Sequence, residues 1–351
     1  MMIQKRYASL VLALLIPAAQ ADLAVNVFTK YQAEVDQCVE RALEFVAGLQ
    51  SEDGSFIGEK GETTGVISLC GMAFLSVGHT PGYGPYGEHI NRCVDYIVSH
   101  QDGQGVLFAG HSGHGPMYSH NISTLFLSEV SGMVNPKRQK RVEKTLGRAL
   151  QVLLRAQQVP KPEMHRGGWR YKPNSNDSDL SCSGWALMAL KSAKLNGATV
   201  PDSAIEEAVK YIYRNHDPRR GTFGYQNHDA HAKTLTGAAV LCLELCGEHG
   251  KPSTIKAGDY ILNNYQSLHH ESHGNYGNYY NAQGMFQLGG KYWEKYAEYL
   301  YKQYPKSQNE DGSFPGHRDG TIYNTAITVL ALTVPYRQLP IYQRDETVDE
   351  E

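Results

Sequence analysis

The feature that most constrains this chain is a short turn, glycine followed two residues later by an aromatic side chain, that recurs along most of its length. Five copies are clear, and a degenerate sixth spans Gly105 to Phe108. The clear copies are Gly54-Ser55-Phe56, Gly167-Gly168-Trp169, Gly221-Thr222-Phe223, Gly274-Asn275-Tyr276 and Gly312-Ser313-Phe314. Their spacing is loose and lies near fifty residues. A repeat of about this length indicates stacked helical hairpins.

Each turn lies between two stretches with helical periodicity. The stretches before the turns have one apolar stripe, and those after the turns are apolar on more than one face, which predicts an outer and an inner helix in each repeat. The predicted outer helices are Val35 to Leu49, His89 to Ser99, Leu146 to Ala156, Ile205 to Tyr213, Ile255 to Tyr265 and Trp293 to Tyr301. The predicted inner helices are Gly65 to Leu75, Asn121 to Val130, Leu180 to Ala193, Lys233 to Leu245, Asn281 to Leu288 and Asn324 to Val334.

Six such hairpins close naturally into a ring around a central cavity. The sequence therefore predicts an all-α fold, an (α/α)6 toroid of six helical hairpin repeats, as a single domain over residues 22–344. The long Gly- and His-rich stretch from Asp102 to Tyr118 is expected to be functional, because irregular segments of that length are otherwise uncommon. Residues 336–344 are expected to pack back on the ring, and 345–351 form an acidic, frayed tail.

The first 21 residues have the pattern of a secretory signal peptide. Lys5 and Arg6 precede a short apolar run, and Ala19-Gln20-Ala21 provides a small-residue cleavage site. We therefore expect a secreted or periplasmic protein that begins at Asp22. No later segment is long and apolar enough to span a bilayer.

Charge excludes one class of partner. The chain has 33 basic and 36 acidic residues and a net charge of -3. No segment provides the basic stripe that a nucleic-acid backbone requires, so a nucleic-acid partner is not expected. The six cysteines are read as small apolar core residues, and Cys38 with Cys93 is the best-placed pair if a disulfide forms.

The turn repeats resemble a known family. Leu49 to Phe56 and Gln308 to Phe314 are similar to the Q-x-x-D-G-x-W repeats of squalene cyclases and protein prenyltransferase β subunits. Gly115 to His120, Gly167 to Tyr171 and Tyr336 to Pro340 resemble the exported, single-toroid bacterial proteins of this superfamily. The resemblance implies the toroid fold and, if the protein is an enzyme, chemistry of the terpene cyclase kind, an isomerase or a transferase.

One stretch resembles the acid motif of the class II cyclases. Those enzymes carry D-x-D-D-T at the start of an inner helix, and the middle Asp protonates an alkene or epoxide. Here the stretch is Asp177-Ser178-Asp179-Leu180-Ser181, so the first and middle acids are present and the third is Leu180. The resemblance implies a catalytic role for Asp179 with Asp177. The alternative is that these residues only cap the helix that follows them.

Aromatic and cationic side chains gather near the predicted starts of the inner helices and indicate a ligand site at the cavity mouth. The candidate ligand-binding residues are Tyr118, His120, Trp169, Arg170, Tyr171, Trp185, Tyr225, His231, Tyr276, Tyr279, Tyr280 and Tyr323. For Trp169 the alternative is a wedge between outer helices. Three histidine pairs, His111 with His114, His228 with His231 and His270 with His273, lack a third ligand with supporting spacing. No metal and no cofactor are therefore expected.

Three hypotheses of function remain open at this point. The first is a toroid that holds an isoprenoid or other lipid in its central cavity, with catalysis in doubt because the acid motif is incomplete. The second is a carbohydrate-active enzyme, a lyase or a hydrolase, whose partner is a polysaccharide and whose base and acid are Tyr and His. The third is a non-catalytic interaction toroid that meets a protein partner at its rim.

Overall fold

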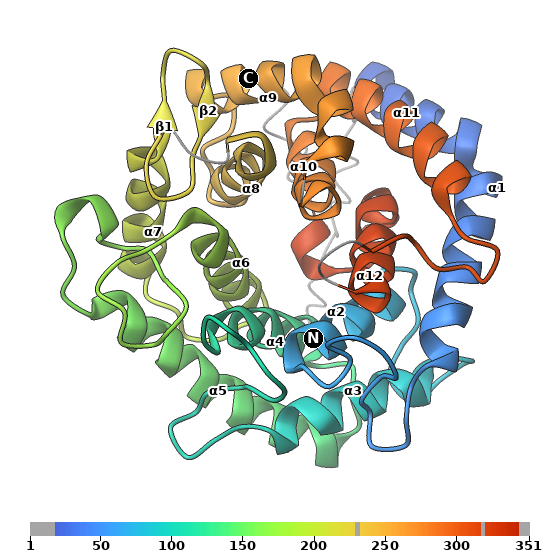
Figure 1. Cartoon of the computed structure of the whole chain (residues 1–351), viewed down its shortest axis with the longest axis vertical. Helices are drawn as coiled ribbons and strands as arrows, with labels where there is room; N and C mark the ends of the chain where they lie inside the picture. The colour runs from blue at the N-terminus through green and yellow to red at the C-terminus, as the bar shows by residue number, and fades with distance from the viewer. Residues whose placement is uncertain (1–17, 229–231, 272, 317–319, 344–351) are drawn as a thin grey trace, which may run out of the picture.

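The chain folds into two concentric rings of helices, as the computed structural model in Figure 1 shows. The structure describes residues 18–228, 232–271, 273–316 and 320–343. Within these residues the α-helices alternate strictly between the outer and the inner ring, which gives six hairpins in chain order. The predicted (α/α)6 toroid is confirmed. Most of the predicted signal peptide, the acidic tail and His231 lie outside the described residues.

The helices end within two residues of the prediction, except the last outer helix, which continues past Tyr301 to Ser307, and several begin earlier than predicted. The outer helices are α1 (Ala18–Gly48), α3 (Gly87–Ser99), α5 (Pro136–Gln158), α7 (Asp202–Arg214), α9 (Pro252–Asn264) and α11 (Gly290–Ser307). The inner helices are α2 (Thr64–Leu75), α4 (Met117–Val130), α6 (Leu180–Leu195), α8 (Ala232–Leu245), α10 (Gly274–Leu288) and α12 (Thr321–Leu332). Short 3-10 helices are η1 (Glu163–His165), η2 (Tyr265–His270), η3 (Val334–Tyr336) and η4 (Pro340–Tyr342).

Burial separates the two rings as the periodicity predicts. Every residue of α2 is buried, because α2 has neighbours on all sides. In α3 the buried residues follow one stripe that includes Ile90, Val94 and Ile97, and the opposite face is in solvent. An all-round apolar helix therefore lies inside and an amphipathic one outside.

The repeated turn links neighbouring hairpins through a side-chain to backbone hydrogen bond. In the first repeat the Gln50 side-chain amide donates to the His89 carbonyl of the next outer helix, at 3.1 Å. Gln101, Gln157 and Gln308 make the equivalent bond at 2.8–2.9 Å to the next outer helix around the ring. Gly54 must be glycine because its φ is +94° and a Cβ there would lie 2.5 Å from the Arg92 carbonyl oxygen.

The same glutamine hydrogen bond closes the ring. Gln308, after the last outer helix, donates to the Cys38 carbonyl in the first helix at 2.8 Å, across 270 residues of sequence. Arg41 of α1 donates to the carbonyls of Asn309 and Glu310 at 2.8 and 3.0 Å. The last hairpin and the first helix are therefore neighbours in Figure 1.

One local expectation is corrected. Gly274-Asn275-Tyr276, read from the sequence as the turn of the fifth repeat, is the first turn of α10, and η2 takes its place between α9 and α10. A two-stranded antiparallel hairpin, β1 (His216–Asp217) with β2 (Thr222–Phe223), forms at the fourth turn. These strands are too short to show an alternating apolar pattern.

The chain end seals one end of the inner ring. Ile341 of η4 donates its backbone N–H to Glu129 Oε2 of α4 at 3.2 Å, and the Tyr342 hydroxyl donates to the Leu330 carbonyl of α12 at 2.9 Å. Gln287 of α10 donates to the Gln343 carbonyl at 3.2 Å. The segment thus bridges the C-terminal ends of several inner helices, which leaves their N-terminal ends as the accessible side.

The cysteines behave as core residues. All six are free thiols, and Cys70, Cys182 and Cys242 are completely buried in inner helices. Cys38 and Cys93 are not bridged. Among the described residues, no helix combines the length and hydropathy that a membrane crossing needs.

Candidate functional site

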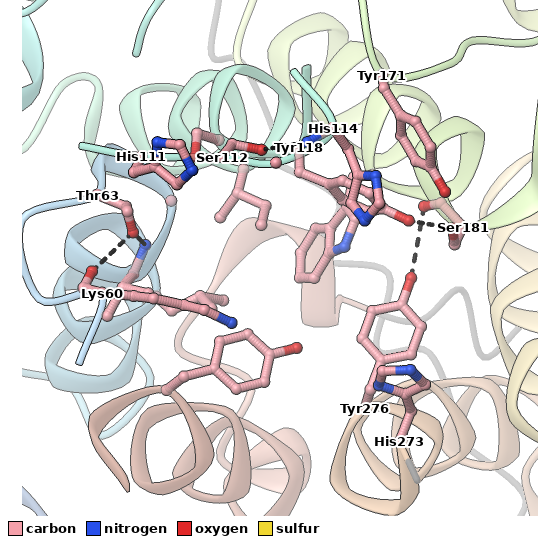
Figure 2. Close-up of a pocket in the computed structure, with 18 of the residues that line it drawn as sticks. Lys60, Thr63, His111, Ser112, His114, Tyr118, Tyr171, Ser181, His273 and Tyr276 are labelled. Carbon is pink, nitrogen blue, oxygen red and sulfur yellow. Dashed lines mark hydrogen bonds between the residues drawn. The ribbon is translucent and has the colours of Figure 1, made fainter. Parts of the chain in front are cut away.

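A cavity of about 640 Å³ opens at the N-terminal ends of the inner helices (Figure 2). This volume lies within the range of roughly 300–1,000 Å³ that is usual for small-molecule sites. Each inner helix contributes only its first two turns to the described wall, together with residues of the loops that precede α2, α4, α6, α8 and α10. The chain's hairpin order therefore brings residues from all six repeats to one mouth.

Six of the predicted ligand-binding residues line this cavity, and they come from five different repeats. They are Tyr118, Tyr171, Trp185, Tyr225, Tyr276 and Tyr323. Trp185 lies one turn deeper than Ser181 on α6 and forms the aromatic floor with apolar side chains of α2, α4 and α8. The wall is therefore apolar below and carries phenol hydroxyls above.

Two predicted site residues instead serve the repeat architecture. The Trp169 backbone N–H donates to Ser183 Oγ at 2.9 Å, and its indole N–H donates to the Leu153 carbonyl at 2.8 Å. In the second repeat the Leu107 N–H donates in the same way to His120 Nδ1 at 3.0 Å. His120 is completely buried, and burial lowers its pKa to about 4, so its ring stays neutral. Neither residue is among those that line the cavity.

Tyr279 and Tyr280 also lie behind the cavity wall. Both are almost fully buried, and their rings pack against Trp185 with centroids 5.2 and 5.5 Å away. They support the aromatic floor without being among its lining residues. Neither tyrosine is part of a repeated turn, which is why the sequence favoured a ligand-binding role for both. The sequence did not show that another aromatic side chain, Trp185, would lie between them and the cavity.

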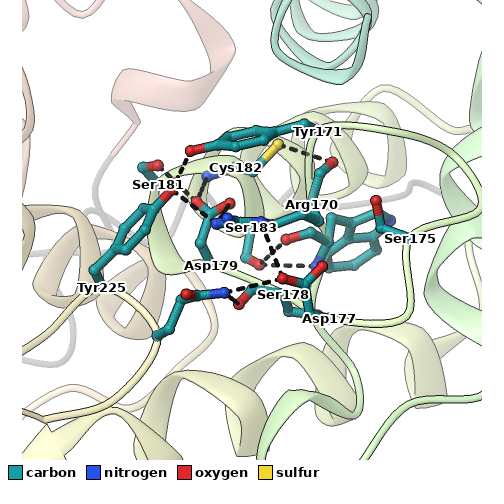
Figure 3. A network of polar contacts seen from close by, with 12 residues as sticks. Arg170, Tyr171, Ser175, Asp177, Ser178, Asp179, Ser181, Cys182, Ser183 and Tyr225 are labelled. Carbon is teal, nitrogen blue, oxygen red and sulfur yellow. Dashed lines mark hydrogen bonds and ion pairs between the residues drawn. The ribbon is translucent and has the colours of Figure 1, made fainter. Parts of the chain in front are cut away.

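Asp179 is the N-cap of α6 and is completely buried (Figure 3). Its Oδ1 accepts from the Cys182 backbone N–H at 2.8 Å and from the Ser181 hydroxyl at 2.6 Å. Its Oδ2 lies 3.1 Å from Nη1 of Arg170. The sequence left capping open as the alternative role of this stretch, and the structure places the cap at Asp179.

Arg170 is held between two acids and two tyrosine rings. Its Nε lies 3.2 Å from Oδ2 of Asp177, and its guanidinium lies 4.2 Å from the Tyr171 ring centroid and 5.3 Å from that of Tyr225. Burial opposes the charge of Arg170, but Asp179 and its other neighbours raise its pKa. Burial raises the pKa of Asp179, and its hydrogen bonds and Arg170 partly offset this. Neither Arg170 nor Asp179 is a lining residue.

Two hydrogen-bonded branches connect this buried ion pair to the cavity wall. In one branch the Ser181 hydroxyl also meets the hydroxyl of Tyr118. In the other, Arg170 Nη1 donates to the Tyr225 hydroxyl at 2.7 Å, which in turn meets the hydroxyl of Tyr171. Ser181, Tyr118, Tyr171 and Tyr225 line the cavity, so the ion pair is connected to it through these four hydroxyls.

The rim carries basic side chains that sequence reasoning left out of the ligand site. Lys60, His111, His114 and His273 line the mouth, and Figure 2 shows the Lys60 side chain extending into it. Lys60 has φ +60°, a left-handed conformation that few non-glycine residues adopt. Two sequence signals pointed to His111 and His114, the long loop before α4 and their spacing as a histidine pair. Among the described residues, no group of three metal-ligating side chains is positioned to hold a metal ion.

The comparisons with known proteins agree with this architecture. The prenyltransferase alpha-alpha toroid domain matches residues 7–115 and 169–276. The structure of the type II terpene cyclase MstE from Scytonema has a TM-score of 0.55 and 11% identity, and covers 88% of this chain and 100% of that one. A variant of MstE in complex with geranylgeranyl dihydroxybenzoate has a TM-score of 0.56, with 11% identity over 87% of this chain and 98% of that one.

A glycosidase variant in complex with glucose is about as similar. Its TM-score is 0.55 at 9% identity, and the match covers 88% of this chain and 98% of that one. At such identities these likenesses concern the fold alone. No curated protein matches the sequence. The family model covers more than half of the chain, and the fold that it describes is the toroid seen in the structure. The chain therefore belongs to the prenyltransferase alpha-alpha toroid family.

Proposed function

We propose that this toroid binds an elongated apolar ligand, an isoprenoid or a similar lipid, in its central cavity and does not cyclise it. The observation that carries the proposal is the shape of the site, a pocket with an apolar and aromatic floor and a polar mouth. The floor includes Val66, Leu69, Ile122, Trp185 and Leu235. Burial of apolar ligand surface there contributes about 25 cal/mol per Å².

The absence of cyclisation follows from the position of Asp179. A class II cyclase acid must deliver its proton to an alkene inside the cavity. Here both carboxylate oxygens are already occupied, Oδ1 by Ser181 and Cys182 and Oδ2 by Arg170. Both oxygens are held by these partners and Asp179 does not line the cavity, so it is not placed to deliver a proton to a ligand there. The positions that follow it in the motif, Leu180 and Ser181, supply no further acid, and Asp177 is paired with Arg170.

A carbohydrate ligand is the second candidate, because tyrosines line the mouth and stack well on sugars. Hydrolysis of a glycosidic bond usually requires two carboxyl groups facing each other. The described lining residues include no Asp or Glu. Elimination by Tyr would require a phenolate, but burial and the Asp179 charge raise the pKa of Tyr118 well above its usual value. The site therefore favours binding over either reaction.

We also propose that the protein is exported and acts outside the cytoplasm, in line with the basic, apolar and small-residue pattern of residues 1–21. In that compartment it would encounter membrane lipids but no nucleotide-activated substrates. N-terminal sequencing of the exported protein should find Asp22. Met1 at the N-terminus would contradict export by signal-peptide cleavage.

The binding proposal is tested by incubating the purified protein with a membrane lipid extract and identifying the retained compounds by mass spectrometry. Ile122→Trp fills the floor and should abolish retention. Leu195→Trp, at the C-terminal end of α6 where the side chain is 60% exposed, adds the same ring away from the floor and should retain lipid as wild type does. Equal retention by wild type and Ile122→Trp, or none by wild type, would contradict the proposal.

A further inference from the structure

The outer helix α5 (Pro136–Gln158) is strongly basic. It has seven basic residues and one acid among its 23, a net charge of +6, whereas the whole chain has a net charge of -3. The five other outer helices have net charges between -3 and +2. The expectation from the sequence that no segment provides a basic stripe is therefore corrected, because acids elsewhere in the chain concealed this helix in the total charge.

Helical periodicity places most of this charge on one face. The buried residues of α5 include Val142, Leu146 and Leu153, which hold the helix on the ring. The basic residues on the opposite face are Lys137, Lys140, Arg141, Lys144, Arg148 and Arg155. At 1.5 Å per residue this basic stripe is about 27 Å long.

Nearby acids neutralise only part of the stripe. Asp95 of α3 is shared by two arginines, Arg138 at 2.7 Å and Arg141 at 2.8 Å. Glu143, the one acid of α5, accepts a hydrogen bond from Gln139 at 3.0 Å. The residues of the stripe that form no ion pair or hydrogen bond through their side chains within the described part of the chain are Lys137, Lys140 and Lys144.

The arginines near the end of α5 bind carbonyl groups and not acids. Arg148 donates to the carbonyls of Asp102 and Gly103 at 2.8 and 2.9 Å, and Arg155 donates to the Gln104 carbonyl at 3.1 Å. These bonds fix the turn of the second repeat against α5. Because a carbonyl has no net charge, they leave the positive charge of the stripe in place.

An exposed methionine lies beyond each end of α5. Met133, in the turn before the helix, is 37% exposed, and Met164, in η1 after it, is 41% exposed. A nucleic-acid backbone would attract the basic side chains but would gain nothing from apolar ones. The surface of a lipid bilayer takes up both kinds of side chain.

We propose that the outer face of α5 docks the toroid on an anionic lipid bilayer, with the basic stripe against the headgroups and Met133 and Met164 in the interface. The inference goes beyond the proposed function, because α5 lies on the outside of the ring and contributes no residue to the described cavity wall (Figure 1). Attraction to the headgroups grows with each basic residue near the surface and falls off within a Debye length.

Vesicle flotation tests the inference with vesicles of phosphatidylcholine alone and of phosphatidylcholine mixed with phosphatidylglycerol in equal parts. Wild type should bind only the mixed vesicles and should dissociate in about 1 M salt, where the Debye length is about 3 Å. The triple variant Lys137→Gln, Lys140→Gln, Lys144→Gln should bind them about 100-fold more weakly, because each such lysine contributes a factor of about five. Gln is a good helix former, so the circular dichroism spectrum should not change.

The matched control is on α11, which lies across the ring from α5 in Figure 1. The triple variant Lys291→Gln, Lys295→Gln, Lys302→Gln removes the same charge from exposed positions and should bind the mixed vesicles as wild type does. Ile122→Trp, which fills the cavity floor, should also dock as wild type does. Loss of lipid retention in the cavity and loss of docking are therefore separate results.

A methionine variant distinguishes a bilayer from a polyanion that attracts charge alone. Met133→Ser combined with Met164→Ser should weaken binding to the mixed vesicles and leave binding to heparin unchanged. No binding of wild type to the mixed vesicles, equal losses in the two lysine variants, or unchanged vesicle binding in the methionine variant would overturn the proposal. Binding of a short DNA duplex in place of the vesicles would overturn it as well.

Discussion

Nη1 of Arg170 lies 3.1 Å from Oδ2 of Asp179, and the Asp179 side chain is completely shielded from solvent. This single contact turns a residue that resembles a cyclase acid into the anionic half of a structural ion pair. It also leaves Arg170 dependent on Asp179, because the guanidinium side chain is only 19% exposed.

Replacing Asp179 should therefore destabilise the fold more than loss of a helix cap alone. Asp179→Asn removes the partner of a largely buried cation, and we expect a loss of about 2–3 kcal/mol, below the usual 3–5 kcal/mol because Asp177 still contacts Arg170. Asp177→Asn is the matched control. Its side chain is 38% exposed, so the loss should stay below about 1 kcal/mol. Urea unfolding of both variants measures this, and equal losses would contradict the assignment.

Glu129 should make the stability depend on pH. It is completely buried, and burial raises its pKa from 4.5 to about 7, although Ser192 and Ile341 donate to it. Because the folded pKa lies above the unfolded one, ionisation penalises folding increasingly from about pH 4.5 to 7, and fully above that. The melting temperature should therefore fall as the pH rises from about 4.5 to 7. The free energy of unfolding should decrease by about 3 kcal/mol over the same window.

Glu129→Gln should flatten that pH profile. A Gln amide can accept from the Ile341 N–H and donate to Ser192, so both contacts survive without a charge. We expect the variant to equal wild type near pH 5 and to exceed it at pH 8. An unchanged slope between pH 5 and 8 would show that another group is responsible.

Gly237 should not tolerate a side chain. It lies where α8 crosses α10, and a Cβ there would be 2.0 Å from Asn281 Oδ1 and 2.9 Å from the Asn281 backbone nitrogen. Gly237→Ala should cost about 1–3 kcal/mol through overpacking. Gly147→Ala, in α5 with no atom within 4 Å of the added Cβ, should instead stabilise by up to about 1 kcal/mol. Thermal unfolding compares the two, and similar shifts would contradict the close crossing.

A chelator should leave the melting temperature unchanged. His111, His114 and His273 line the same mouth, yet no group of three ligating side chains in the described part of the chain has metal-binding geometry. Folding free energy that depended on a metal would be lost on chelation. A stoichiometric metal in the purified protein, together with a lowered melting temperature in chelator, would contradict the expectation.

The ring was predictable because its signals are local. A glycine turn, an amphipathic stripe and an all-apolar helix can each be recognised from a few neighbouring residues. Their repetition along the chain strengthens the prediction of the fold. The prediction failed at Gly274-Asn275-Tyr276, where the same letters begin α10. There the glycine takes part in a helix, and nothing within three residues distinguishes the two uses.

The site was less predictable because its residues are brought together only when the chain has folded into the ring. Arg170 and Asp179 were both named as site residues, but their pairing requires a chain reversal that spacing alone does not show. His120 was assigned to the ligand for its polarity, whereas it accepts from Leu107 as Ser183 does from Trp169. Lys60 lines the cavity and has a positive φ, and neither feature was predicted from the sequence.

The bond from Gln308 to the Cys38 carbonyl also bears on how the protein is made. In an open solenoid each new repeat can dock on the one before it as the chain emerges. Here α1 is synthesised first, but its flank is covered by α11, α12 and the turn at Asn309, all near the end of the chain. The first helix must therefore wait for almost complete translation before it acquires its last neighbour. A chain that stops before the sixth hairpin has two uncovered apolar edges, which makes the closed ring an all-or-none product of synthesis.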